Sequence, residues 1–135
     1  MKETRALATL KRLYPTADFL TISGLATGGA FDVNGCQLNP LTEAGIEVWV
    51  ELKQCPKPKT PRGHVKPTVQ AGQVGWEACR RAAGGRTFIG LMLDSEFYLL
   101  PGWCIKELKN EGMTMARVDE LRLDSGSLFD SFRGS

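Results

Sequence analysis

The chain has 135 residues, of which 42% are hydrophobic and 24% are charged, and its formal net charge is +2. These values are typical of one soluble domain with a single core, and they exclude a polycation. No apolar run approaches the roughly 20 residues that span a membrane, and the charged first segment lacks the apolar block of a signal peptide. We therefore expect a cytoplasmic protein without a membrane partner.

The first half of the chain changes from helical to strand-like spacing. Apolar residues recur at helical intervals until Pro15 ends the pattern, and short apolar segments follow. The clearest strand covers residues 46–52, where Ile46 and its alternate neighbours point to one face and Glu47 and its alternates to the other. We expect a helix at 3–14 and strands at 18–23, 30–33 and 46–52.

The second half begins with a Pro-rich loop and a helix that the pair Gly84 and Gly85 closes. Two apolar runs separated near Asp94 then indicate a strand pair. This order predicts an α/β fold in which a mixed β-sheet lies between helices, within a single domain at 1–123. Residues 124–135 are expected to form a flexible or partner-docking tail. The expected elements are a helix at 69–83, strands within 86–94 and 96–102, a short helix at 102–110 and a weak strand at 115–123.

The cysteines and the histidine exclude several kinds of site. The four cysteines stand far apart without a C-x-x-C pair, and His64 is the only histidine. This spacing does not favour a zinc site, a redox pair or a Cys/His or Ser/His triad. Scattered cysteines in a cytoplasmic chain are most often reduced and structural.

The tripeptide Glu-Leu-Lys occurs twice, and its context decides which copy carries chemistry. Glu107 and Lys109 lie in an expected helix, where residues two positions apart do not share a face. Glu51 and Lys53 end the clearest strand, where the same spacing puts both side chains on one face. For this second pair, a strand whose polar face simply meets water is the alternative interpretation.

Asp32 strengthens the interpretation of Glu51 and Lys53 as a site. It follows a glycine-rich approach, GGAFD. If residues 30–33 pair with residues 48–52, Asp32 and Glu51 converge within reach of one cation. Two carboxylates and a backbone carbonyl are oxygen ligands that suit Mg²⁺. Lys53 would then lie beside the metal, where an ammonium can orient a water and offset charge on a phosphate.

Asp32, Glu51 and Lys53 resemble the catalytic pattern of the PD-(D/E)xK nuclease superfamily, which is an Asp, a spacer and then acid-x-Lys. Phe31 stands where that pattern usually has a proline. The resemblance implies a restriction-endonuclease-like core with the order α-β-β-β-α-β-β. The spacing of residues 3–100 predicts the same order.

Residues 65–100 are similar to a narrower group, the small phage-type branch with a VRR-NUC-like domain. In that branch a helix carries Q-x-x-W and precedes a glycine pair and two strands, and Gln73 and Trp76 fit this motif. The resemblance implies that Gln73 contacts Lys53, the attacking water or the phosphate. Gln70, one turn earlier, is the alternative. Trp76 is expected in the core rather than stacked on a base.

The resemblance also implies a Mg²⁺ site, with Mn²⁺ as a substitute ion. Its ligands would be Asp32, Glu51 and the Leu52 backbone carbonyl, and Lys53 would assist the attacking water. Glu3 matches an N-terminal helix acid of many relatives that binds a second or water-mediated metal. An acid that only complements the helix dipole is the alternative for Glu3.

Basic side chains gather in the loop after the clearest strand and near the end of the following helix. The loop at 54–66 contains no acid. A solvated loop is one interpretation, and a surface that binds phosphates is the other. The expected nucleic-acid-binding residues are Lys57, Lys59, Arg62, His64, Lys66, Arg80 and Arg81.

These expectations converge on a phage-encoded, Mg²⁺-dependent DNA endonuclease that recognises branched or Holliday-junction DNA. The resemblance implies a homodimer in the host cytoplasm, with virion association or a phage-protein partner at the C-terminal tail as further expectations. The rival hypothesis is a noncatalytic nuclease-fold module of a phage particle or packaging complex, because folds can outlast their functions.

Overall fold

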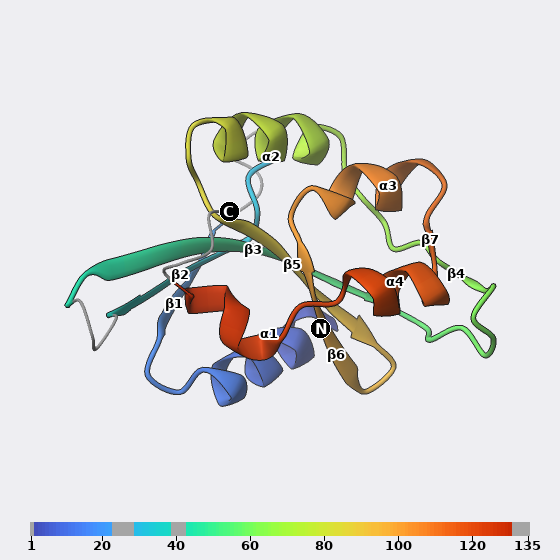
Figure 1. The fold of residues 1–135 in the computed structure, drawn as a ribbon, viewed down its shortest axis with the longest axis horizontal. Helices are drawn as coiled ribbons and strands as arrows, with labels where there is room; N and C mark the ends of the chain where they lie inside the picture. The colour runs from blue at the N-terminus through green and yellow to red at the C-terminus, as the bar shows by residue number, and fades with distance from the viewer. Residues whose placement is uncertain (1, 23–28, 39–42, 131–135) are drawn as a thin grey trace.

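The computed structural model describes residues 2–22, 29–38 and 43–130 and contains a sheet between two layers of helices (Figure 1). The sheet has five strands in the order β1-β2-β3-β5-β6, and β3 and β5 are parallel while the other neighbours are antiparallel. Its strands are β1 (Asp18–Thr21), β2 (Val33–Leu38), β3 (Gly45–Cys55), β5 (Thr87–Leu93) and β6 (Glu96–Pro101). This arrangement confirms the expected mixed sheet flanked by helices and the order α-β-β-β-α-β-β.

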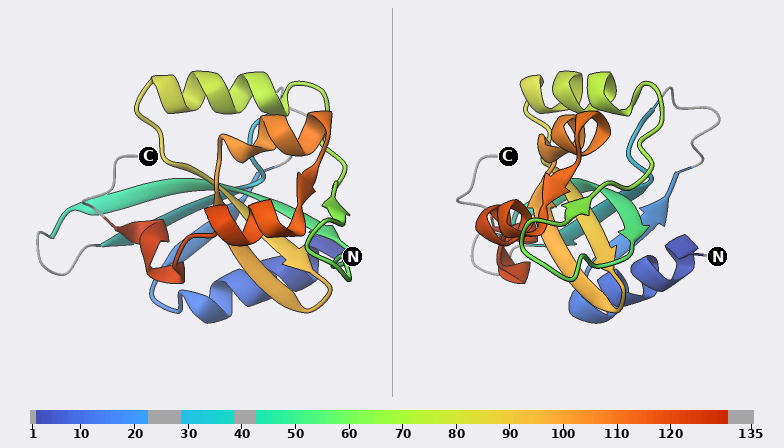
Figure 2. Two further views of the ribbon diagram at one scale, coloured as in Figure 1. Left: turned by 45° about the vertical axis from the view of Figure 1, so that its right-hand side comes forward. Right: turned by 90° about the vertical axis from the view of Figure 1, so that its right-hand side faces the viewer.

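The helices cover the two faces of the sheet unequally (Figure 2). One face carries α2 (Gln73–Ala82) and α3 (Cys104–Asn110), and the other carries α1 (Lys2–Leu13). The remaining elements are β4 (His64–Val65), β7 (Met113–Thr114), α4 (Met115–Leu121) and the 3-10 helix η2 (Ser125–Phe129), with β4 and β7 paired in a small second sheet. No helix in the described part of the chain has the length and apolarity to cross a membrane.

Strand β3 separates two apolar cores. Ile46, Val48, Val50 and Leu52 are buried on one face, where they pack with α1 residues such as Leu10. The core on the opposite face joins β5 and β6 to α2 and α3. The period-two alternation of β3 therefore sends its apolar side chains into the α1 core and Glu51 and Lys53 toward the helices α2 and α3.

The second strand differs from the sequence expectation. Residues 30–33 were expected as the strand, with a polar connection after them, but β2 covers Val33–Leu38 and pairs along its whole length with β3. Gly35 makes this possible, because a side chain there would meet the Phe19 ring at 2.7 Å. Pairing with a long neighbouring strand thus overrides the weak strand propensity of this polar segment, and Asp32 lies just before the strand.

The C-terminal part also differs. Residues 115–123 were expected as a weak strand but begin with α4, because the Thr114 side chain accepts a hydrogen bond from the Arg117 amide at 3.1 Å and caps the helix. Within the expected tail at 124–135, η2 buries Leu128 and Phe129 in the α1 core. Residues 125–129 therefore pack against the α1 core, and residues 131–135 of the expected tail lie outside the described residues.

Replacing Leu128 with alanine tests whether η2 is part of the domain. Leu128 is 0% exposed, so we expect Leu128→Ala to lower the free energy of unfolding by about 2–5 kcal/mol through lost burial and a cavity. Urea denaturation measures this change. Leu38→Ala is the matched control, because Leu38 is 61% exposed and its loss should change stability little. Equal stability of Leu128→Ala and the parent protein would contradict the packing of η2.

Candidate functional site

Four side chains that are distant in the sequence meet where β2 begins. The register pairs Val33 with Val50, so Asp32 lies beside Glu51 at the point where β3 continues beyond its neighbour. Gln73, the first residue of α2, reaches the same point from above the sheet. Lys53 follows on the same face of β3. The structure therefore brings together Asp32, Glu51, Lys53 and Gln73.

The Glu51 carboxylate is the centre of this group and is only 4% exposed. Its Oε1 accepts a hydrogen bond from the Asp32 amide at 3.1 Å, and its Oε2 accepts one from Gln73 Nε2 at 2.7 Å. The Lys53 ammonium lies 3.1 Å from the same Oε2. A buried carboxylate needs such donors, because each replaces hydration that burial removes.

The Asp32 side chain joins the other edge of the group. Its Oδ1 accepts a hydrogen bond from the Leu52 amide at 3.2 Å, while the Asp32 amide binds Glu51. The two bonds form a reciprocal link between the two strands. Because the amide and carbonyl of one strand residue point to the same side, the Leu52 carbonyl also faces the edge where Asp32 lies.

Lys53 is held in one position by three acceptors. Its ammonium donates to the Thr68 carbonyl at 2.7 Å and to Gln73 Oε1 at 3.0 Å, and it forms the ion pair with Glu51. An ammonium has three donors, so these contacts use all of them. Lys53 is 9% exposed, which makes this a buried pair rather than the water-facing strand end considered above.

Gln73, rather than the side chain of Gln70, enters the group. Gln73 is 7% exposed, whereas the side chain of Gln70 is exposed. The Gln70 backbone amide donates to Gln73 Oε1 at 3.0 Å and helps to hold it. Because Oε1 faces two donors, Nε2 is directed at Glu51.

Two glycines allow the segment before Asp32 to approach the start of α2. Gly29 and Gly72 both have positive φ angles, 99° and 93°. A Cβ on Gly29 would lie 2.5 Å from the Gly72 carbonyl carbon, so no side chain fits there. This backbone contact brings the chain entering β2 against the chain entering α2, and so places Asp32 and Gln73 near one carboxylate. The sequence analysis identified the glycine-rich approach to Asp32 but placed Gly72 inside an expected helix at 69–83, whereas α2 begins only at Gln73 and Gly72 precedes it. The contact between the two glycines was therefore not predicted.

A cavity of about 230 Å³ opens beside the group. Its walls come from β3 and the loop before α2, and they include Glu51, Lys53, Thr68 and Gln73. Carboxylate, amide and carbonyl oxygens here suit a hard divalent cation. Within the described residues, no group of three or more His, Cys, Asp or Glu side chains gathers to hold a metal. Glu3 lies in the first turn of α1, and its side chain lies outside the described residues.

The expected nucleic-acid-binding residues fall into two sets. Lys59, Arg62, His64 and Lys66 are exposed on the loop that leads to Thr68. This loop is tied down, since the Met115 amide donates to the Gly63 carbonyl at 2.9 Å and β4 pairs with β7. In the second set, Lys57 pairs with Glu96, Arg81 pairs with Glu77, and Arg80 lies over two tryptophan rings. Lys66 of the first set also has a partner, because its ammonium donates to the Asn110 carbonyl at 2.9 Å.

The cysteines near these elements do not offer a reactive thiolate. Burial raises the pKa of the Cys55 thiol at the end of β3, and it raises the pKa of Cys104 to about 12. Both thiols therefore stay protonated near neutral pH. All four cysteines are free.

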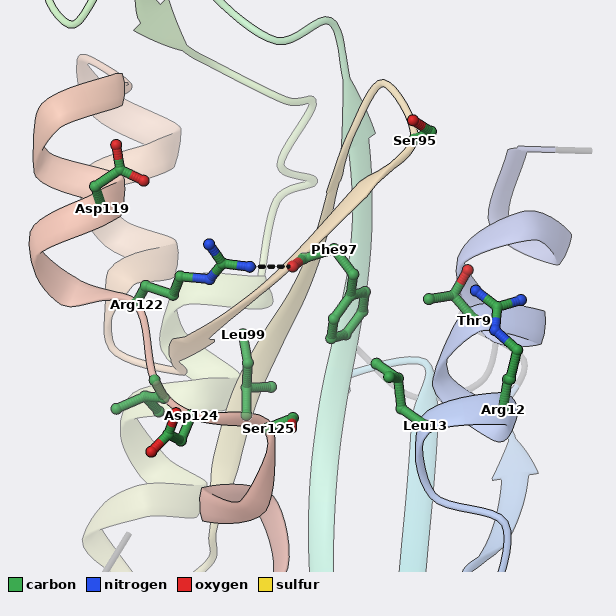
Figure 3. Close-up of a pocket in the computed structure, with 11 residues that line it drawn as sticks. Thr9, Arg12, Leu13, Ser95, Phe97, Leu99, Asp119, Arg122, Asp124 and Ser125 are labelled. Atoms are coloured by element: carbon green, nitrogen blue, oxygen red, sulfur yellow. Dashed lines mark hydrogen bonds between the residues drawn. The ribbon is translucent and has the colours of Figure 1, made fainter.

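A larger cavity, of about 610 Å³, lies on the α1 side of the sheet (Figure 3). Arg12 and Leu13 of α1 form one wall, Phe97 and Leu99 line the β6 side, and Arg122 lies on the α4 side. Arg122 donates to the Phe97 carbonyl at 3.1 Å. Glu51 and Lys53 point to the opposite face of the sheet, so this cavity is separate from the carboxylate site.

No protein-family model matches the chain, and no curated protein sequence matches it. Among solved structures, the chain is similar to Hjc, a Holliday junction resolvase from Archaeoglobus fulgidus, an archaeal hyperthermophile. The two superpose with a TM-score of 0.50 and 12% sequence identity, over 85% of this chain and 95% of the resolvase chain. The likeness extends across nearly the whole domain and shows that the two proteins share a fold.

The buried pair of Glu51 and Lys53 makes a prediction about stability. Lys53→Met leaves the Glu51 carboxylate buried without its cation, so we expect a loss of about 3–5 kcal/mol in the free energy of unfolding. Adding Glu51→Gln should recover part of this loss, because the buried charge is removed. Urea denaturation of the two single variants and the double variant measures the coupling.

Lys57→Met provides the matched control, because Lys57 forms an exposed pair with Glu96. Its urea midpoint should stay near that of the parent protein. A Lys53→Met protein as stable as the Lys57→Met protein would show that the Glu51–Lys53 contact does not contribute to folding.

Proposed function

We propose that this chain is a Mg²⁺-dependent endonuclease that hydrolyses phosphodiester bonds in branched DNA. The observation that carries the proposal is the convergence of Asp32, Glu51, Lys53 and Gln73 around one cavity. These are the residues of the PD-(D/E)xK pattern and of the Q-x-x-W motif, in that order along the chain. The shared fold with a Holliday junction resolvase supports the same class of substrate.

Each residue has a role that follows from its chemistry and position. Asp32, Glu51 and the Leu52 carbonyl would hold Mg²⁺, with Mn²⁺ as a substitute and Glu3 as a candidate ligand of a second ion. Bound there, the metal would polarise the phosphate and lower the pKa of a bound water. The Lys53 ammonium would orient the attacking water or offset charge on the phosphate. Gln73, whose Nε2 already donates to Glu51, would position the water or a phosphate oxygen.

The observed contacts describe a closed form of this site. Lys53 and Gln73 both bind Glu51 Oε2. A carboxylate oxygen that binds a metal must have a free lone pair. A carboxylate has about four lone-pair sites, and three donors already use Glu51. One site on this carboxylate therefore remains for a metal, and a divalent cation bound there would repel the Lys53 ammonium. We expect metal binding to loosen the Lys53 contact and to turn the ammonium toward the substrate.

The exposed basic loop would bind the DNA backbone beside the cavity. Arg62, His64 and Lys66 precede Thr68, whose carbonyl contacts Lys53, so phosphates held by the loop lie next to the site. Such contacts fix the position of DNA without reading its sequence. Lys57 and Arg81 contribute less to this surface, since each is paired with a carboxylate of the chain.

Further features of the proposal rest on the sequence resemblance alone. They are membership of the VRR-NUC-like branch, a phage origin, action in the host cytoplasm with virion association, and a homodimer in which two sites cut two strands. A phage-protein partner at the C-terminus would have to bind beyond η2, because Leu128 and Phe129 are buried in the core.

A second candidate is a noncatalytic binding module with this fold. The observation that favours it is the complete set of partners around Lys53 and Glu51, which stabilises the group without a metal. Isothermal titration with Mn²⁺ separates the two candidates. A nuclease site should bind Mn²⁺ in the parent protein and lose binding in Asp32→Asn, whereas a noncatalytic module should bind in neither.

The central test is a cleavage panel of linear, nicked, flapped and four-way DNA in Mg²⁺ and in Mn²⁺. We expect metal-dependent cutting of the branched substrates. Asp32→Asn and Lys53→Ala should lower the rate at least about 100-fold, since each removes a group next to the reacting phosphate. Circular dichroism and urea denaturation establish that each variant is folded.

The second Glu-Leu-Lys tripeptide supplies a matched control. Lys109 is exposed on α3, so Lys109→Ala repeats the change made at Lys53 outside the site. Its cleavage rate should equal that of the parent protein. Equal rates for folded Asp32→Asn, Lys53→Ala and parent proteins would reject the proposed site.

A further inference from the structure

Arg80 is held in an unusual position two turns after Gln73 on α2. Its guanidinium carbon lies 5.3 Å from the ring centre of Trp49 and 5.3 Å from that of Trp76. The two indoles meet edge to face, with centroids 5.4 Å apart. Among the described residues, no carboxylate forms an ion pair with Arg80, unlike its neighbour Arg81, which binds the buried Glu77. The rings therefore position an exposed cation on the surface of α2.

The aromatic group is continuous with the candidate site. Trp76 packs on Phe31 at 5.1 Å between centroids, and Phe31 directly precedes Asp32. Trp49 lies two residues before Glu51 on the same face of β3, which is about 7 Å along the strand. A group bound at Trp49 would therefore lie close to the carboxylates of Asp32 and Glu51.

The sheet beside Trp49 is left open by the described helices. The β2–β3 hairpin extends past the C-terminal end of α2 (Figures 1 and 2). In the cross-strand row Leu20, Asn34 and Trp49, Leu20 is 59% exposed and the other two are half-buried. Exposed Glu47, two residues before Trp49 on the same face, bounds this area with a negative charge.

We propose that Trp49 and Arg80 bind one unpaired nucleotide of the substrate strand. The base stacks on the accessible part of the Trp49 indole, and its phosphate accepts hydrogen bonds from the Arg80 guanidinium. Aromatic rings stack on bases of any sequence once these leave the duplex, and a planar guanidinium binds phosphate through two parallel bonds. The exposed Glu47 carboxylate disfavours a phosphate beyond this position, which favours a strand path toward the Glu51 cavity.

This inference rests on the proposed function and narrows its substrate class. A fully paired duplex keeps its bases stacked and offers none to Trp49. The preferred DNA would therefore carry unpaired nucleotides next to the cut, as a flap or an opened branch does. The basic loop would contact paired and unpaired DNA alike, because it would bind only the phosphate backbone.

The test measures binding without cleavage. A fluorescently labelled poly(dT) oligonucleotide is titrated in EDTA at low salt, and a blunt duplex of equal length is titrated in parallel. Trp49→Leu should weaken binding of the single strand about tenfold or more and leave the duplex nearly unchanged. Arg80→Gln should weaken it comparably and reduce the salt dependence of binding.

Two matched variants control for charge and for the loss of an exposed tryptophan. Arg12→Gln removes an exposed arginine on the opposite side of the sheet, and Trp103→Leu removes an indole that is 40% exposed near α3. Both should bind like the parent protein. Equal weakening by Arg12→Gln and Arg80→Gln would mean a diffuse charge effect and would overturn the proposal.

A second measurement keeps Trp49 in place and so does not depend on the folding of its variant. In Trp103→Phe, the remaining indoles are Trp49 and Trp76. Poly(dT) should quench their fluorescence, and the duplex should not. Absence of quenching at saturation would overturn the stacking role. If poly(dT) quenches the fluorescence but the protein does not cut DNA, only the nuclease proposal is contradicted. If the protein cuts DNA but poly(dT) does not quench the fluorescence, only the role of Trp49 and Arg80 is contradicted.

Discussion

The structure depends on the two hydrogen bonds and the ion pair that one buried carboxylate, that of Glu51, receives. Glu51 is 4% exposed, and its oxygens are bound by the Asp32 amide, the Gln73 side chain and the Lys53 ammonium. Each donor comes from a different part of the chain, so the carboxylate fixes the entry into β2, the start of α2 and the end of β3 together. Leaving any of these groups unpaired in the core is costly. Gly29 and Gly72 allow the chain entering β2 and the chain entering α2 to come this close, because a Cβ on Gly29 would lie 2.5 Å from the Gly72 carbonyl carbon.

This arrangement links stability to function. The contacts that hold Lys53 and Gln73 on Glu51 stabilise the protein without a ligand, and the metal proposed for the same carboxylate would compete with them. Sites that bind and release ligands commonly hold such exchangeable contacts at a cost in stability. The Thr68 carbonyl accepts a hydrogen bond from the Lys53 ammonium, and Lys66 of the basic loop lies only two residues before Thr68. The proposed DNA contact at Lys66 and the proposed loosening of Lys53 are therefore joined by the backbone of residues 66–68.

Periodicity predicted the mixed sheet and the flanking helices, and motif order predicted that Asp32, Glu51, Lys53 and Gln73 lie close together. Their roles in catalysis and metal binding stay predictions. The alternation of β3 correctly separated Val48 and Val50 from Glu51, because burial of one face follows from the pleat. Local sequence patterns gave wrong predictions where contacts with residues distant in the sequence determine the structure of a segment. The polar segment of β2 became a strand by pairing with β3, and η2 became part of the core through Leu128. Neither the Thr68 carbonyl nor the Arg80 contact with Trp49 follows from spacing, since both join elements through the tertiary fold.

A crystal structure of the protein soaked in Mn²⁺ tests the proposed metal site most directly. We expect an anomalous peak between Asp32 and Glu51, near the Leu52 carbonyl, within ligand distance of their oxygens. We also expect the Lys53 ammonium to have moved away from its 3.1 Å contact with Glu51. Saturating Mn²⁺ without a peak at this place, and with Lys53 still bound to Glu51, would contradict the proposed metal site.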